Sequence, residues 1–287
     1  MFTGQDNFGA QNTLNQLDEL TASMDQAKLP HGSEENFQNF DIEFRHVDFK
    51  YDDTFVLKNF NLTLHQNKTY ALIGSSGGGK STIAKLISGF YPVDGGEILI
   101  GGKNIQSYSE KALIQNIAFV FQHSQLLKTS IYENVRIGNS QATRQQIMDA
   151  LDAANCTSIL DKFSQREMTV IGAKGVYLSG GEVQRIAIAR AILKNANIII
   201  MDEASAAADP ENEYELQQAF QKLMRGKTVI MIAHRLSSIK DADCIYVLQN
   251  GEIVESGTHS RLIEKNGIFA RMWKNYSEAA EWKIARR

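Results

Sequence analysis

The feature that most constrains this chain is the glycine-rich stretch Gly74-Ser75-Ser76-Gly77-Gly78-Gly79-Lys80-Ser81-Thr82, which fits the pattern G-x-x-x-x-G-K-[ST]. A short apolar run at 69–73 precedes it, and a helical pattern follows from Ser81. A strand, a glycine loop and a helix in this order form a phosphate-binding loop, because the backbone N–H groups and the positive helix end face an anion. We therefore expect Lys80 to reach the outer phosphates of a nucleotide and Ser81 to bind Mg²⁺.

The composition is that of an ordinary globular protein. The chain has 287 residues, of which 43% are hydrophobic and 22% charged, and this length allows one large domain or two small ones. A formal net charge of -3 gives no basic excess, so no nucleic-acid partner is expected. Cys156 and Cys244 lack metal-ligand spacing, which favours reduced thiols in a cytosolic protein. No apolar stretch approaches the roughly 18 residues of a membrane span, and the N-terminus does not read as a signal peptide.

The sequence before the loop predicts a linker and two paired strands. Leucines at helical spacing predict a short amphipathic helix over about 10–29, which Pro30 ends, followed by a polar linker over 33–39. From Asp41 an alternating pattern predicts a strand with a bulge or register shift between Phe44 and Val47. A second strand is predicted at 60–64, with Tyr51 in the turn between the two strands.

After the loop, short apolar strands alternate with helical patterns. Strands are expected at 97–100, 117–121, 198–201 and 228–232, with a last hairpin around Asn250-Gly251 and a helical tail from Arg261. A helical insert is expected between Gln122 and Ser179. The predicted fold class is therefore α/β, a P-loop NTPase core whose mostly parallel sheet carries helices on both faces, with an N-terminal antiparallel β layer and a helical insert.

Polar side chains follow several strands at their carboxyl ends, where open α/β sheets bind ligands. Asp202 would hold Mg²⁺ directly or through a coordinated water, and Glu203 would orient or deprotonate an attacking water. His234 could bond a γ-phosphate or hold the water geometry, and Gln122 could sense Mg²⁺ or water. Tyr51 could stack on adenine. Taken alone, each of these last three residues is more often structural or a surface residue.

A second anion-binding pattern lies at Leu178-Ser179-Gly180-Gly181, directly before a predicted helix. Small residues free the backbone N–H groups, and the helix N-terminus is positive. One chain thus carries two helix starts suited to phosphate. Either the two helix starts of one chain bind two ligands, or helix starts from two chains bind one ligand between them.

Together these residues resemble the nucleotide-binding domain of an ATP-binding cassette (ABC) transporter. The resemblance covers about residues 41–270 and depends on the signature at 178–181 with Gln184-Arg185, and on the order of the motifs along the chain. In that order they are Tyr51, the phosphate loop, Gln122, the signature, Asp202-Glu203, Asp209 and His234. The runs at 233–239 and 251–259 resemble the exporter-type branch, whose cassette usually follows membrane helices in the same chain.

The resemblance implies a division of the chain and a location. Residues 1–40 would be a linker at the end of a membrane-domain connection, 41–275 the nucleotide-binding domain with a helical subdomain at about 123–180, and 276–287 a tail. The frayed helix at 10–29 could instead pack on its own domain. We expect a fragment of a longer transporter, itself soluble, at the cytoplasmic face of the cell membrane.

The resemblance also implies cofactors, partners and roles. ATP and Mg²⁺ would be bound, with Lys80, Gln122, Glu203 and His234 catalytic and with Ser81, Gln122 and Asp202 at the metal. Tyr51 and residues 74–82 would bind ATP. Ser179, Gly180, Gly181 and Glu182 of one chain would face the γ-phosphate held by a second, identical or different, nucleotide-binding domain. The transmembrane domain of the transporter would be the other partner, and ATP would favour the closed dimer.

Three positions depart from the family pattern. Glu182 replaces the usual Gln and would bring a carboxylate near the partner's nucleotide. Ala206 replaces a Ser, which would remove one hydrogen bond across the dimer, and Ala173 replaces an acidic residue before the signature. The core chemical groups are complete, so we predict an active hydrolytic site.

Two alternatives belong to other classes. One is a soluble ABC-type ATPase acting on DNA or ribosomes, although such chains usually carry two cassettes or long coiled-coil insertions. The other is a regulatory ATP-binding module without turnover, against which Glu203 and His234 argue. About six apolar segments of roughly 20 residues encoded upstream would favour the transporter. The transported substrate and the direction of transport stay open.

Overall fold

A computed structural model describes residues 31–121, 124–172, 175–202, 210–233 and 236–284 of the chain. Several sequence predictions lie outside these described residues, namely the helix at 10–29, Gln122, Ala173, Glu203, Ala206, Asp209 and His234.

The first layer is a four-stranded antiparallel sheet of order β2-β1-β4-β5. Its strands are β1 (Ile42–Tyr51), β2 (Thr54–Leu64), β4 (Gly95–Ile100) and β5 (Lys103–Asn104). The predicted irregularity in β1 is confirmed, since its pairing with β2 shifts register between Phe44 and Val47. Two details differ from the sequence prediction. Tyr51 ends β1 rather than lying in the turn, and β4 and β5, which follow the phosphate loop in sequence, pair into the layer that was predicted to precede it.

The second layer is a six-stranded sheet of order β10-β9-β3-β8-β7-β6. Neighbouring strands run parallel except at β10, which pairs antiparallel with β9. The strands are β3 (Thr69–Gly74), β6 (Ile117–Val120), β7 (Ile198–Asp202), β8 (Thr228–Ile232), β9 (Cys244–Gln249) and β10 (Glu252–Gly257). The mostly parallel sheet expected from the alternating apolar strands is thus confirmed.

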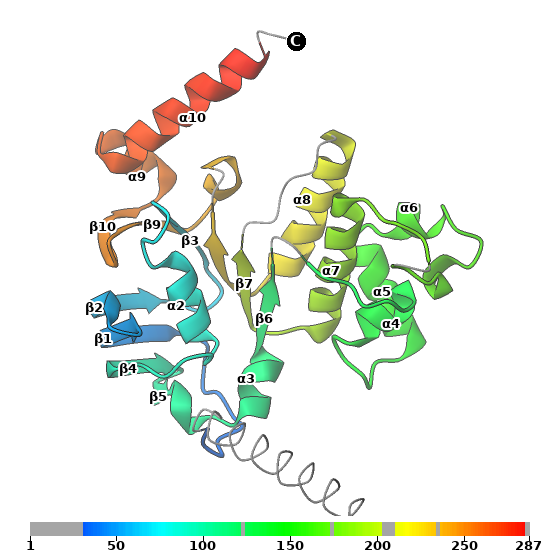
Figure 1. The fold of residues 1–287 in the computed structure, drawn as a ribbon, viewed down its shortest axis with the longest axis horizontal. Coiled ribbons are helices and arrows are strands. Elements are labelled where there is room, and N and C mark those ends of the chain that lie inside the picture. Colours follow the sequence, from blue (N-terminus) through cyan, green and yellow to red (C-terminus); the bar gives the residue numbers. More distant parts are fainter. Residues whose placement is uncertain (1–30, 122–123, 173–174, 203–209, 234–235, 285–287) are drawn as a thin grey trace, which may run out of the picture.

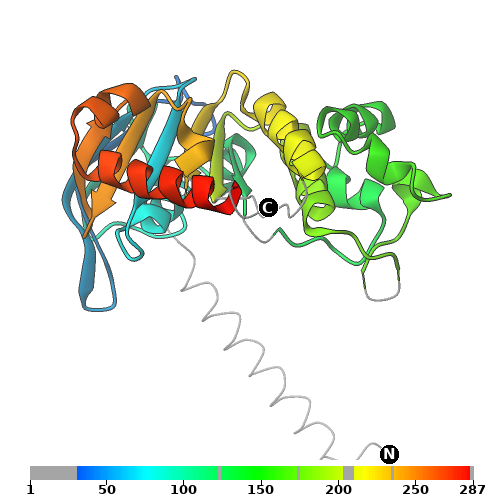
Figure 2. The same cartoon turned by 90° about the horizontal axis from the view of Figure 1, so that it is seen from above.

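Helices flank the sheets, and α4, α5 and α6 form a separate helical lobe (Figure 1). Figure 1 shows α2 beside the antiparallel sheet, and α4, α5 and α6 on the far side of α7 and α8. In Figure 2 the same lobe extends away from the sheets, and α10 lies across the sheet-containing part. The α-helices are α2 (Lys80–Ile87), α3 (Glu110–Asn116), α4 (Ile131–Arg136), α5 (Arg144–Ala153), α6 (Thr157–Leu160), α7 (Gly180–Lys194), α8 (Pro210–Met224), α9 (His259–Glu264) and α10 (Ile268–Ile284). Short 3₁₀ turns are η1 (Ile105–Ser107), η2 (Arg166–Met168) and η3 (Leu236–Ile239).

Among the helices of the described residues, none combines the length and apolar character needed to cross a membrane.

The parallel sheet separates two hydrophobic cores. In β3, Tyr70 and Leu72 pack with α2 and the antiparallel sheet, whereas Ala71 and Ile73 pack on the opposite side with residues of α4, α5, α7 and α8. Successive side chains of a strand point to opposite faces, so a strand covered on both sides is apolar at every position. This burial explains why the strands read as continuous apolar runs in the sequence.

The C-terminal helices pack around a half-buried histidine. Glu255 caps α10 by accepting hydrogen bonds from the backbone N–H groups of Ile268 (2.6 Å) and Phe269 (2.9 Å). The His259 ring lies edge-on to Trp273, with ring centroids 4.3 Å apart, and its buried Nε2 has no hydrogen-bond partner among the described residues. Burial, and then the charge of Lys240, lower the pKa of His259.

Strand β7, which lies between β8 and β6, provides a test of the core. Ile200 is fully buried on the side of α2, and Ile200→Ala should lower the free energy of unfolding by about 3 kcal/mol because it leaves a cavity. Ile114→Ala removes the same atoms at a position that is 57% exposed and should cost less than about 1 kcal/mol. Urea denaturation of both variants checks this, and equal losses would contradict the described burial.

His259 predicts a pH dependence of stability. Its lowered pKa means that the unfolded chain takes up a proton more readily, so stability should fall as the pH drops through about 6.5, the ordinary histidine value. The variant His259→Phe keeps the ring packing and should reduce this fall, measured by urea denaturation at several pH values. His65→Gln, at an exposed position, is the control and should leave the fall in place. An unchanged slope in His259→Phe would rule out His259 as its source.

Candidate functional site

The phosphate loop joins β3 to α2 in the conformation that its glycines require. Gly74, Gly77 and Gly79 have positive φ values of 136°, 78° and 95°. At Gly74 a Cβ atom would lie 1.9 Å from the carbonyl oxygen of Leu248, so only glycine fits there. The backbone N–H of Gly78 bonds the carbonyl of Ser75 at 3.1 Å, which closes the turn.

Lys80 lies inside this loop. Its Nζ donates to the carbonyl oxygens of Gly74 (3.0 Å) and Ser75 (2.7 Å), and the residue is 5% exposed. Burial lowers the pKa of Lys80, and the charge of Asp202 partly offsets this effect. A buried ammonium is costly without an anion nearby, so the loop is suited to a negatively charged ligand.

The start of α2 has the other properties of a phosphate site. Gly79 is the N-cap and offers no side chain to the first-turn N–H groups, and no acidic residue lies in the first turn. Ser75, Ser76, Gly77 and Ser81 are exposed around the loop, whereas Thr82 is buried beneath it. The N–H groups, the cation and the absence of a carboxylate in this turn fit a phosphate group.

Asp202 lies at the same edge of the sheet as the phosphate loop. The register pairs Asp202 of β7 with Ile232 of β8, and Ile232 with Leu72 of β3, so the three strands end together. Val120 of β6 pairs with Met201 and ends at this edge too. Asp202 is half-buried and acts electrostatically on Lys80. A carboxylate beside the loop and its hydroxyls is an oxygen set that Mg²⁺ prefers.

Tyr51 lies near α2 rather than in an isolated turn. Its ring is edge-on to Phe49 and Tyr91, with centroids 4.9 Å and 5.5 Å away, and Lys85 Nζ lies 5.8 Å from its centroid. Lys85 belongs to α2, the helix that the phosphate loop opens. These contacts place Tyr51 beside the last turn of α2, and contact of its ring with a base stays a prediction from the sequence.

The second predicted helix start forms a capping box at α7. Ser179 is the N-cap, its side chain accepts from the N–H of Glu182, and the carboxylate of Glu182 accepts from the N–H of Ser179 at 2.7 Å. The other carboxylate oxygen pairs with Lys162 Nζ at 2.7 Å. Burial acts to raise the pKa of Glu182, but the hydrogen bonds from Lys162 and Ser179 outweigh it and lower that pKa. The sequence analysis missed Lys162, although the S-x-x-E pattern could have indicated the capping box.

The sequence analysis also missed a buried link between α7 and α8. Arg185 is 2% exposed, pairs with Glu215 of α8 and donates to the carbonyl of Asn155 at 3.0 Å. The signature helix, α7, is thereby joined both to the helical lobe and to α8, the helix that follows β7. No sequence pattern marked Glu215 or Asn155 as partners.

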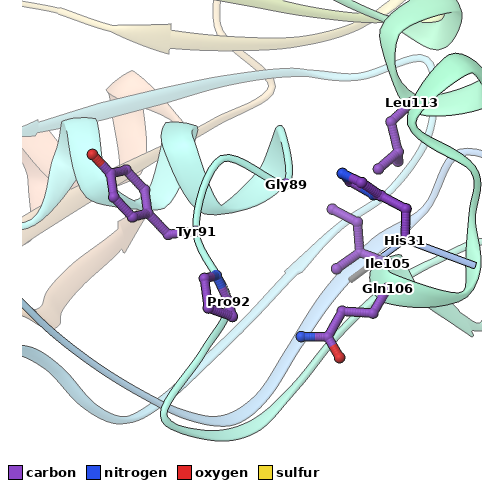
Figure 3. A pocket seen from close by; sticks show the side chains of 7 residues that line it. All are labelled: His31, Gly89, Tyr91, Pro92, Ile105, Gln106 and Leu113. Carbon is purple, nitrogen blue, oxygen red and sulfur yellow. The ribbon is translucent and has the colours of Figure 1, made fainter. Parts of the chain in front are cut away.

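A small pocket lies at the other end of α2 and is separate from the phosphate loop. Figure 3 shows its lining residues, with His31 and Leu113 on one side and Pro92 and Tyr91 towards the other. Gly89, just after α2, also lines it. Because the phosphate loop opens α2 and the pocket lies beyond its last turn, we assign the pocket no part in the nucleotide site.

Comparisons with known proteins find similar chains and a similar fold. The chain is 42% identical over 267 residues to the ATP-dependent lipid A-core flippase of Syntrophus aciditrophicus (strain SB), covering 92% of this chain and 43% of that protein. It is 43% identical over 236 residues to ABC transporter B family member 19 of Arabidopsis thaliana, covering 81% of this chain and 19% of that protein. A solved structure described as a bacterial Atm1-family ABC exporter with ATP bound is 33% identical, with a TM-score of 0.83 over 92% of this chain and 47% of that one.

The chain thus spans less than half the length of each of these proteins. The profile of the family described as ABC transporter matches residues 57–206. This match begins within β2, includes the phosphate loop, the helical lobe and α7, and extends past Asp202. It covers more than half of the chain, which therefore belongs to the ABC transporter family.

Proposed function

We propose that this chain is the ATP-binding and hydrolysing cassette of an exporter-type ABC transporter. The observation that carries the proposal is the arrangement of the phosphate loop, buried Lys80 and Asp202 at one edge of the parallel sheet. Such an edge provides a cation for phosphate and a carboxylate for a metal ion, the groups that phosphoryl transfer to water needs most. The relatives, among them an ATP-dependent flippase and an exporter with ATP bound, support the same activity.

Each residue of the proposed site would have its own role in binding or hydrolysing ATP. Lys80 and the N–H groups of the phosphate loop hold the outer phosphates, and Tyr51 contacts the adenine. Ser81, Asp202 and Gln122 hold Mg²⁺, which supplies neutralising charge when bound. Glu203 orients or deprotonates the attacking water, and His234 supports the γ-phosphate and that water. The last three of these side chains, Gln122, Glu203 and His234, are assigned from their sequence positions after β6, β7 and β8.

A second copy of the cassette, identical or related, would complete each site. Ser179, Gly180 and Gly181 lie at the start of α7. Figure 1 shows α7 on the other side of the parallel sheet from α2, the helix that the phosphate loop opens. A Cβ atom added at Gly180 would meet no described atom within 4 Å, so this helix start is open to a partner. Head-to-tail pairing would bring it to the γ-phosphate held by the other chain, in a closed two-fold arrangement. ATP then stabilises the dimer, and hydrolysis removes that stabilisation.

A transmembrane domain would dock on an exposed aromatic face beside the helical lobe. Phe90, Phe119 and Phe121 form a stack with centroid separations of 5.5 Å and 5.1 Å, and Phe121 is 51% exposed. A cleft next to the stack is lined from α7 by Arg190 and Lys194. An apolar face rimmed by cations suits a protein segment with apolar and acidic side chains. The cassette would thus act at the cytoplasmic face of a membrane.

ATP turnover tests the proposed function directly. Phosphate release from Mg-ATP, expressed per chain, should rise with protein concentration, because each site forms between two chains. Glu203→Gln should lower the rate by at least about a hundredfold, the usual contribution of a general base. A rate per chain independent of concentration would require a light-scattering mass with ATP bound, to separate a stable dimer from a single-chain site. A variant as active as the parent would remove Glu203 from the mechanism.

Nucleotide binding tests the role of Lys80. Lys80→Met should weaken binding of a fluorescent ATP analogue by about tenfold to a hundredfold, because charge-assisted hydrogen bonds contribute about 1.5–3 kcal/mol. The melting temperature without nucleotide is measured alongside, because the variant also leaves the carbonyl oxygens of Gly74 and Ser75 without their donor. Lys111→Met, at an exposed lysine of α3, is the control and should bind like the parent. Unchanged binding in Lys80→Met would contradict the site.

A further inference from the structure

The two helix starts that we assign to phosphate binding differ in charge. The first turn of α2 contains no acidic residue, whereas the first turn of α7 contains Glu182. A carboxylate stabilises a free helix N-terminus, but it repels a phosphate that approaches the same N–H groups. The α7 start therefore suits an anion only if the charge of Glu182 is balanced and its carboxylate is held away from the ligand.

The structure provides both conditions through one cation. Glu182 is 6% exposed, and its two oxygens are engaged separately, one with the N–H of Ser179 and one with Lys162 Nζ, each at 2.7 Å. The carboxylate is thus turned back against the N-cap. Lys162 follows α6 in the helical lobe, and its side chain is 58% exposed, so the ammonium reaches Glu182 from the surface.

We propose that Lys162 is a positioning residue for the signature helix start: it neutralises Glu182 and holds its carboxylate on Ser179, so that the N–H groups of Gly180 and Gly181 can bind the γ-phosphate of a nucleotide held by a second chain. This inference rests on the proposed function. It assigns to Lys162 a task that a neutral glutamine at 182 would not require. Lys162 should matter only while residue 182 carries a negative charge.

The helical lobe contains a matched ion pair that serves as a control. Arg144 of α5 pairs with Glu167 of η2, and the side chains are 73% and 6% exposed, respectively. An exposed cation again neutralises a buried carboxylate, but neither residue belongs to a helix start assigned to phosphate. Loss of this pair should report any general effect of breaking an ion pair in the lobe.

The test compares Lys162→Met, Glu182→Gln, the double variant, Lys162→Arg and Arg144→Met with the parent chain. For each protein, kcat and KM for Mg-ATP are measured, together with the melting temperature. Lys162→Met should lower kcat/KM about tenfold, mainly by raising KM, because an uncompensated carboxylate faces the phosphate. Lys162→Arg and Arg144→Met should stay within about twofold of the parent. The double variant should have the same kcat/KM as Glu182→Gln, which serves as its reference.

The decisive comparison is between the effect of Lys162→Met in the parent and its effect in Glu182→Gln, since a role of Lys162 unrelated to the charge of Glu182 would persist in the double variant. A double variant about tenfold less active than Glu182→Gln, a parent-like Lys162→Met, or an Arg144→Met as impaired as Lys162→Met would each overturn the inference while leaving the proposed function intact. If the parent dimerises with ATP but shows no turnover, the same comparison is made on the dimer dissociation constant. A parent that neither turns over ATP nor dimerises would overturn the proposed function, and this inference with it.

Discussion

The parallel pairing of β3, β8 and β7 is the constraint on which the rest of the structure depends. Their common direction and register bring Gly74, Ile232 and Asp202 to one edge of the sheet. Burial between two cores stabilises this register, because a slip by one residue would exchange the side chains that face α2 with those that face α7 and α8. The chemistry of the site is therefore a consequence of how the sheet is covered.

The phosphate loop holds a buried positive charge, the ammonium of Lys80, which is unfavourable in a protein interior unless it has polar partners. Lys80 is buried, and its pKa is lowered by that burial, yet its Nζ has two carbonyl partners and the influence of Asp202. These contacts satisfy the ammonium without neutralising it fully. An ammonium held in this way inside a glycine loop is positioned for an anion.

The start of α7 also holds a buried charge, here the negative carboxylate of Glu182. At α7 the N-terminus is stabilised by a carboxylate, and Lys162 removes the net charge. Arg185 then joins α7 to α8 and to the chain next to α6. A displacement of α7 would therefore strain contacts with α8, the helix that follows Asp202, which offers a physical route between the two elements that we propose to bind phosphate.

Local sequence patterns determined the phosphate loop, the strand and helix order, the bulge in β1 and the helix start at Ser179, because each depends on residues close together in the chain. The roles of Gln122, Glu203 and His234 stay predictions from the sequence. Only the tertiary structure decided that β4 and β5 join the antiparallel layer, that Lys162 holds Glu182 and that Arg185 meets Glu215. These contacts join segments far apart in the chain, and hydrophobic periodicity carries no information about which distant polar side chains meet.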